Sequence, residues 1–191
     1  MRDMQLSVAD KEELLRIARV SIASVLNDRP GERSEQSGAS LKEQCGAFVT
    51  RHLHGELRGC IGYIEAQFPL FETIEEAAVK AAFEDPRFPP LTAEEFEDVE
   101  IEISVLSPLQ KTSSVDEIEV GKHGLVIDAG YTRGLLLPQV ATEYGWGREQ
   151  FLSQTCRKAG LPADAWKKKG VTIHRFTSDV FSEAEMFRKG H

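Results

Sequence analysis

Apolar residues recur along the chain with two spacings, and together they predict both helices and strands. Between residues 11 and 26 they follow the period of about 3.6 residues that marks an amphipathic helix. Asp10 with Glu13 resembles a capping box that opens this helix. Between residues 99 and 105 every second residue is apolar, which is typical of a strand with one solvent-exposed face.

The region between these two elements predicts a hairpin followed by a second helix. Residues 45–53 and 57–64 are rich in strand formers, and the turn material His54-Gly55-Glu56 separates them. The second helix begins near Pro69, because proline is tolerated in the first turn of a helix. It ends before residues 85–90, where three prolines make a stiff connector that cannot be helical.

The second half of the chain repeats this order of elements. In the first half, a capping box of Thr92 with Glu95 indicates a short helix just before the strand at residues 99–105, so the order there is strand, strand, helix, short helix and strand. The sequences Arg58-Gly59 and Arg133-Gly134 echo one another at an offset of 75 residues. In the second half, strand, strand, helix, short helix and strand are predicted at residues 124–128, 132–137, 147–159, 162–168 and 171–174.

We infer an α+β protein built from two pseudo-repeated lobes that pack as one unit. Each lobe contains a β-hairpin, two helices and a return strand. A single domain spans residues 10–185, with lobe one at about 41–107 and lobe two at about 118–183. The helix at 11–26 packs on this unit.

Residues 27–40 contain one apolar residue, Ala39, and cannot bury enough surface to offset the entropy of ordering them. They predict a mobile surface loop. A lid over a binding site is the functional alternative for this loop.

Composition and charge narrow the class of protein. The chain has 191 residues, with 31 acidic against 23 basic side chains and a formal charge of −8. An acidic chain disfavours nucleic acid as a partner, because phosphate binding needs a basic surface. No apolar run approaches the roughly 20 residues of a membrane-spanning helix, and the start resembles no signal peptide. We therefore expect a cytoplasmic protein that does not act at a membrane.

Three cysteines, Cys45, Cys60 and Cys156, form no CxxC pair, so a disulfide framework or a thiolate zinc site is disfavoured. The sequence also lacks the glycine-rich nucleotide loops, the GxSxG elbow and the HExxH motif. We expect no cofactor and no metal.

The segment Leu57-Arg58-Gly59-Cys60-Ile61-Gly62 is the most unusual in the chain. Glycines inside a strand mark a bulge or a close backbone approach. Cys60 between them, two residues after Arg58, is a candidate thiolate nucleophile. The alternative is that Cys60 is a small packing residue and that the glycines permit tight contacts.

Histidines and paired carboxylates offer further candidates. His52 and His54 would point to one face of a strand and, with a cysteine, could hold a metal, although exposed histidines are common at hairpin ends. His123 lies between glycine-rich neighbours, so we expect it to be accessible and a possible proton carrier. Glu100 and Glu102 share the wet face of their strand, which favours a solvated surface over acid–base catalysis.

The chain also resembles the AMMECR-one domain family, through short blocks that occur in the family's order. The glycine-rich block at 57–62 is the most specific of them, and the resemblance covers roughly residues 10–185. The blocks are Gly46-Ala47-Phe48-Val49-Thr50, residues 57–62, Asp85-Pro86-Arg87-Phe88-Pro89-Pro90, Val120-Gly121-Lys122-His123-Gly124, and Leu137-Pro138-Gln139-Val140-Ala141 with Tyr144-Gly145-Trp146.

The resemblance implies a two-lobed α+β fold and a protein of unestablished reaction. Microbial members are called AmmeMemoRadiSam system protein A. That name implies action beside a Memo-like protein, which resembles extradiol dioxygenases, and beside a radical S-adenosylmethionine enzyme. The block at 57–62 is suspected as the family's functional centre, and this chain has Arg58 and Cys60 in it.

Two hypotheses of different class follow. In an enzyme, Cys60 is the nucleophile, Arg58 stabilises its thiolate, His123 carries the proton and Arg87 positions the substrate. In a non-catalytic module, the surface around Arg58 and Arg87 docks a partner protein. Under either hypothesis, binding residues are predicted at Arg87, Gly59, Gly62 and Trp146.

Overall fold

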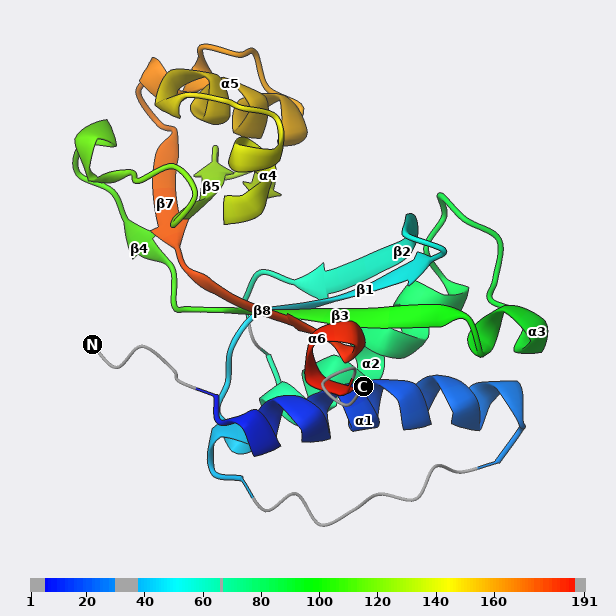
Figure 1. The fold of residues 1–191 in the computed structure, drawn as a ribbon. Helices are drawn as coiled ribbons and strands as arrows, with labels where there is room; N and C mark the ends of the chain where they lie inside the picture. Colours follow the sequence, from blue (N-terminus) through cyan, green and yellow to red (C-terminus); the bar gives the residue numbers. More distant parts are fainter. Residues whose placement is uncertain (1–5, 30–37, 66, 188–191) are drawn as a thin grey trace. The chain divides into compact units, whose positions relative to one another are not determined.

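The computed structural model describes residues 6–29, 38–65 and 67–187, and the chain divides into two compact units (Figure 1). Among the described residues, the first unit contains those up to residue 106 and those from 179 to 187, and the second contains residues 107–178. Each unit has its own sheet and its own hydrophobic core.

The first unit is built on a four-stranded sheet in the order β2-β1-β3-β8. Strand β1 is central and pairs antiparallel with both β2 and β3. The elements of this unit are α1 (Val8–Leu26), η1 (Ser40–Lys42), β1 (Ala47–Leu53), β2 (Glu56–Tyr63), α2 (Leu70–Phe83), α3 (Ala93–Phe96), β3 (Val99–Leu106), β8 (Ser178–Ser182) and α6 (Glu183–Phe187).

Helices α1 and α2 lie on the same side of this sheet and bury the core against it (Figure 1). Alternate residues of β1 and β3, such as Val49 and Ile103, are fully buried there, as the two-residue period of a strand requires. Helix α1 begins earlier than predicted. Ser7 is its N-cap, and Asp10 takes the third helical position, where its carboxylate accepts the Ser7 N–H.

The second unit has a four-stranded sheet in the order β4-β7-β5-β6. Helix α5 packs on β5 and β6, and Phe151, Leu152 and Cys156 are buried in this core. The elements are β4 (Gln110–Lys111), η2 (Val115–Glu117), β5 (Gly124–Asp128), β6 (Arg133–Leu136), α4 (Pro138–Glu143), α5 (Arg148–Lys158), η3 (Ala165–Lys167) and β7 (Thr172–Phe176).

The α+β class is confirmed, and both predicted hairpins are present. In each sheet the first hairpin strand lies between its hairpin partner and the return strand, in the orders β2-β1-β3 and β6-β5-β7. A relationship by repetition between the two halves stays a prediction. Strands β4 and β8 were not predicted. Strand β4 has only two residues, which is too few to show a period, and in β8 the two apolar residues, Val180 and Phe181, are adjacent and do not alternate with polar ones.

The unit boundaries differ from the lobes expected from the sequence. Residues 107–117 belong to the second unit, and residues 179–183 return to the first through β8 and the start of α6. Most of the expected loop, residues 30–37, lies outside the described residues. Within the described part of the chain, helices long and apolar enough to cross a membrane are absent.

Candidate functional site

The glycine-rich motif forms most of β2, which is an edge strand of the first sheet. Its register with β1 slips, so that Gly59 faces Arg51 while Leu57 faces His52. Arg58 is therefore the additional residue of a β-bulge, as the two glycines predicted.

The glycines allow neighbouring backbone to approach β2 closely. A Cβ at Gly59 would overlap the carbonyl oxygen of Ala81 in α2 and the Arg51 side chain. A Cβ at Gly62 would overlap the carbonyl oxygen of Ala47 in β1. Close packing is sufficient to explain both glycines, and their part in ligand binding stays a prediction.

Arg51 is a fully buried cation that the sequence reasoning missed. Its guanidinium donates to the Ala81 carbonyl at the end of α2 and to the Arg58 carbonyl at the bulge, the latter at 2.9 Å. Burial lowers its pKa to about 10, so it stays charged at neutral pH. The available signal was a charged residue at an inward-facing position, two residues after Val49.

Asp85 and Arg87 hold the exposed edge of β2 at Cys60. The Cys60 N–H donates to the Asp85 carboxylate at 2.9 Å, and Arg87 donates to the Cys60 carbonyl at 3.1 Å. Arg87 also pairs with Asp85 at 2.7 Å. The pair thus satisfies the two backbone groups that an edge strand leaves without a neighbouring strand.

The Cys60 sulfur is half-buried on β2, and the Thr50 hydroxyl of β1 donates to it at 3.3 Å. Burial raises the pKa of the Cys60 thiol, which outweighs the opposing effects of Thr50 and Arg87. Asp85 and Glu102 raise this pKa further. The surroundings therefore favour the protonated thiol at neutral pH, in contrast to the thiolate that a nucleophile needs.

The Arg58 side chain bonds to the proline-rich connector and to the helix that follows it. Its guanidinium forms a two-point contact with Glu95, at 3.2 and 2.8 Å, and donates to the Pro89 carbonyl at 2.7 Å. Glu95 in turn caps α3 through Thr92, as predicted, and Arg58 lowers the pKa of its carboxyl. Arg58 thus ties β2 to the proline-rich segment, and its side chain contacts Glu95 instead of the Cys60 sulfur.

His123 lies in the second unit, and the expectation that it is accessible is wrong. Only 7% of it is exposed, and burial lowers its pKa. Its Nδ1 accepts the Glu119 N–H at 3.0 Å, so the imidazole is held within its own loop. Gly121, two residues before His123, has a φ of 88° and provides a left-handed turn in this loop.

Trp146 also belongs to the second unit. It packs against that unit's core and stacks on Tyr144 with ring centroids 4.9 Å apart. Tyr144 is 68% exposed, so an aromatic surface is present there. The structure does not assign a ligand to it, and the binding role of Trp146 stays a prediction.

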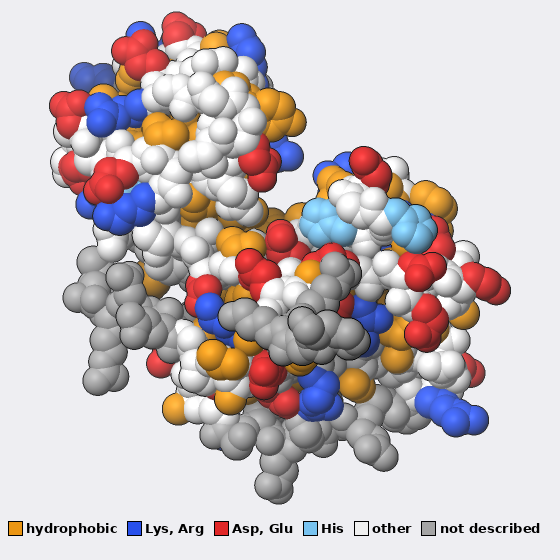
Figure 2. Space-filling view, viewed as in Figure 1, with side chains coloured by type: hydrophobic (Ala, Val, Ile, Leu, Met, Phe, Trp, Pro, Cys, Tyr) orange, Lys and Arg blue, Asp and Glu red, His pale blue; other side chains and the backbone are white. Residues whose placement is uncertain are grey.

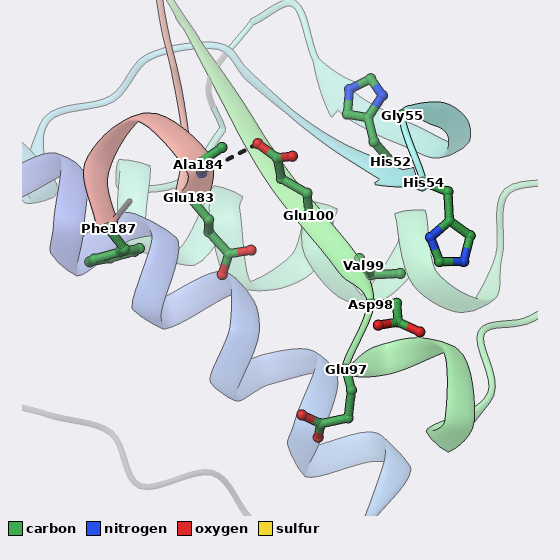
Figure 3. A pocket seen from close by; sticks show the side chains of 10 residues that line it. All are labelled: His52, His54, Gly55, Glu97, Asp98, Val99, Glu100, Glu183, Ala184 and Phe187. Atoms are coloured by element: carbon green, nitrogen blue, oxygen red, sulfur yellow. Dashed lines mark hydrogen bonds between the residues drawn. The ribbon is translucent and has the colours of Figure 1, made fainter. Parts of the chain in front are cut away.

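A groove of about 720 Å³ lies elsewhere in the first unit, between the β1–β2 turn, the start of β3 and α6 (Figure 3). Its walls include His52, His54, Glu97, Asp98, Glu100 and Phe187. The histidines do not share a strand face as expected, since β1 ends at Leu53 and His54 has a φ of 52° in the turn. Among the described residues, clusters of three or more metal-ligating side chains are absent.

Comparison with known proteins identifies the relationship of this chain. The family model described as AMMECR1 matches residues 15–181. The chain belongs to the AMMECR1 family. The structure of the uncharacterized protein PH0010 from Pyrococcus horikoshii is similar to this AMMECR1 chain, with a TM-score of 0.84 and 39% sequence identity over 90% of each chain.

Two archaeal relatives of this AMMECR1 chain have no activity in their names. Protein MJ0810 of Methanocaldococcus jannaschii is 48% identical over 76% of both chains. A protein of Methanothermobacter thermautotrophicus is 43% identical over 96% of this chain and 99% of its own length. These relatives support the family assignment and leave the reaction open.

The fold brings two of the AMMECR1 sequence blocks together. The block in β2 and the connector at residues 85–90 meet through Asp85, Arg87 and Arg58. The later blocks, with His123 and Trp146, belong to the second unit. Cys60, Arg58 and Arg87 thus form one local network, in which the contacts shape the strand edge and the connector.

Proposed function

We propose that this chain is a non-catalytic binding module that docks a partner protein on the surface formed by β2 and the proline-rich connector. The partner is the Memo-like protein that the family resemblance implies, and the radical S-adenosylmethionine enzyme is a further component of the same system. One observation carries the proposal: hydrogen bonds between side chains and backbone groups join the glycine-rich motif to its connector, and burial raises the pKa of Cys60.

The thiol chemistry supports a structural role for Cys60. A catalytic cysteine needs a lowered pKa or a base in hydrogen-bond reach. Here the hydroxyl of Thr50 bonds to the sulfur, and a hydroxyl is a poor base at neutral pH. The Cys60 backbone is meanwhile fixed on both its N–H and its carbonyl.

The connector supports a docking role for Arg87. Its side chain is 52% exposed, although it pairs with the buried Asp85. Its guanidinium also lies over the Phe88 ring, 5.4 Å from the centroid. Prolines restrict this segment, so little entropy is lost when a partner binds it. Exposed, preorganised arginine and aromatic groups are typical of energetically important interface positions.

Calorimetric titration of this chain with the Memo-like protein from the same organism measures their affinity and tests the proposal. We expect Cys60→Ser to bind within about twofold of the parent, since the sulfur makes no part of the proposed contact. Arg87→Ala should weaken binding by about tenfold or more. Arg29→Ala, which removes an exposed arginine elsewhere in the first unit, is the matched control and should bind normally.

Two measurements distinguish a docking defect from a folding defect. Circular dichroism confirms that Arg87→Ala is folded at the titration temperature, and Arg87→Lys keeps the positive charge beside Asp85. Alkylation of Cys60 across pH is measured in parallel. Loss of binding in Cys60→Ser, or Cys60 alkylation faster than a free thiol at pH 7, would falsify the binding-module proposal and support the enzyme.

A further inference from the structure

We infer that the groove between the β1–β2 turn, β3 and α6 is a binding site for a primary alkylammonium group. The groove lies entirely in the first unit, and its volume of about 720 Å³ is in the range of small-ligand pockets. It is separate from the contacts around Cys60, and its lining residues come from three distant parts of the sequence.

The walls of the groove are held by Arg19 of α1. Its guanidinium pairs with Glu183 through two contacts of 2.6 Å, which anchors the start of α6. It also donates to the carbonyls of Phe96 and Val99, which fixes the entry into β3. Arg19, whose side chain is 31% exposed, thus links α6 to the entry of β3, so these two walls are preorganised for a ligand.

Further contacts complete the scaffold. Glu183 accepts the Ile101 N–H at 2.9 Å, and Glu100 accepts the Ala184 N–H at 3.3 Å, as the dashed line in Figure 3 marks. Both bonds join β3 to α6. Rigid positioning of this kind is what a site built on secondary structure provides.

The charge of the lining selects the ligand. Glu97, Asp98 and Glu100 are acidic, and lysine and arginine are absent from the described lining. Arg19, which contacts the lining residues Val99 and Glu183, forms an ion pair with Glu183, so its positive charge is neutralised. Figure 2 shows histidine side chains beside acidic ones on this side of the first unit. A groove of this polarity attracts cations and repels anions.

The remaining lining indicates which cation fits. His52 and His54 line the groove, and an imidazole ring nitrogen that carries no proton can accept a hydrogen bond from an ammonium group. Phe187 is 56% exposed at the α6 side, where its ring can pack an alkyl chain or face a cation. Acceptors with an exposed aromatic ring match an ammonium on a hydrocarbon chain better than a hydrated inorganic cation. A free polyamine and a lysine side chain share this chemistry.

Titration of the full chain with two probes tests this site and distinguishes a free polyamine from a lysine side chain as the ligand. Spermidine represents a free polyamine, and a terminally blocked Ala-Lys-Ala peptide represents a lysine side chain. The same peptide with acetylated lysine is the neutral control. We expect saturable binding of at least one charged probe, a chemical-shift footprint on His52 and His54, and no binding of the acetylated peptide.

Paired variants distinguish the groove from the general attraction of an acidic protein for polyamines. Glu97→Gln with Asp98→Asn removes two lining charges and should weaken binding at least tenfold. Glu72→Gln with Glu94→Gln removes two exposed charges outside the lining and should change affinity less than twofold. Equal weakening in the two double variants, or no saturable binding of either charged probe, overturns the inference.

This inference is independent of the docking proposal, because its residues differ from Arg58 and Arg87. Loss of Memo-like protein binding in Arg87→Ala leaves the groove result unchanged. Failure of the spermidine and peptide titrations likewise leaves the docking test intact.

Discussion

At the scale of single residues, Asp85 connects the backbone of Cys60 to Arg87. Its side chain is only 2% exposed, and it accepts hydrogen bonds from the Cys60 N–H, the Arg87 N–H and the Arg87 guanidinium. Arg87 holds the pKa of the Asp85 carboxyl well below its usual range, and the two backbone donors act in the same direction. Four hydrogen bonds to one buried carboxylate fix the position of the connector.

Asp85→Asn should therefore lower the free energy of unfolding by about 1–3 kcal/mol at pH 7, as expected for charged hydrogen bonds with a partly exposed partner. The folded-state pKa is depressed, so this contribution is fully present above the unfolded-state pKa of about 3.9, falls progressively below it, and is lost as pH falls through the folded-state pKa. Urea unfolding of both proteins at pH 7 and near pH 3 measures this. A difference that stays constant with pH contradicts the assignment.

At the scale of elements, strand β2 is defined by how closely α2 approaches it. Gly59 lies under the end of α2, and the Arg51 guanidinium fills the remaining space while it caps that helix. The C-terminal carbonyls of a helix have no partner within the helix. The bulge, the glycine and the buried arginine thus form one joint between strand and helix.

Gly59→Ala tests this joint. The added Cβ meets the Ala81 carbonyl and Arg51, so β2 and α2 must separate, and we expect a loss of about 1–3 kcal/mol from overpacking. Gly147→Ala is the control, because a Cβ there meets nothing within 4 Å and the backbone is extended with a φ of −77°. Chemical denaturation measures the free energy of unfolding of both variants. A smaller loss for Gly59→Ala than for Gly147→Ala contradicts the close packing of β2 against α2.

At the scale of the whole molecule, the described chain has two hydrophobic cores, one in each unit. Phe151 anchors the second core, and Ile74 anchors the first; both are fully buried. The chain leaves the first unit after β3 and returns to it through β8. Local destabilisation should therefore stay largely within one unit.

Phe151→Ala should cost about 3–5 kcal/mol in the second unit, since it removes a large buried side chain. We expect faster amide hydrogen exchange across residues 107–178, measured by mass spectrometry, with a much smaller change in β1 and α2. Ile74→Ala is the reciprocal variant and should accelerate exchange mainly in the first unit. Equal acceleration of both units by either variant indicates one cooperative core.

The sequence by itself determined the elements whose signal is local. The helix around residues 8–26, the hairpins and the strand at residues 99–106 follow from periodicity, turn residues and caps that act over a few positions. The Thr92–Glu95 capping box and the bulge beside Gly59 were predicted for the same reason.

Only the tertiary structure decided which polar side chains are buried and which groups they contact, because both depend on residues far apart in the chain. It buried His123, turned Asp85 and Arg87 onto the Cys60 backbone, and placed Arg51 under α2. The groove assembles residues near positions 52, 98 and 184, whose neighbourhood no local pattern encodes. Periodicity specifies which face of an element is apolar, and long-range packing specifies what that face meets.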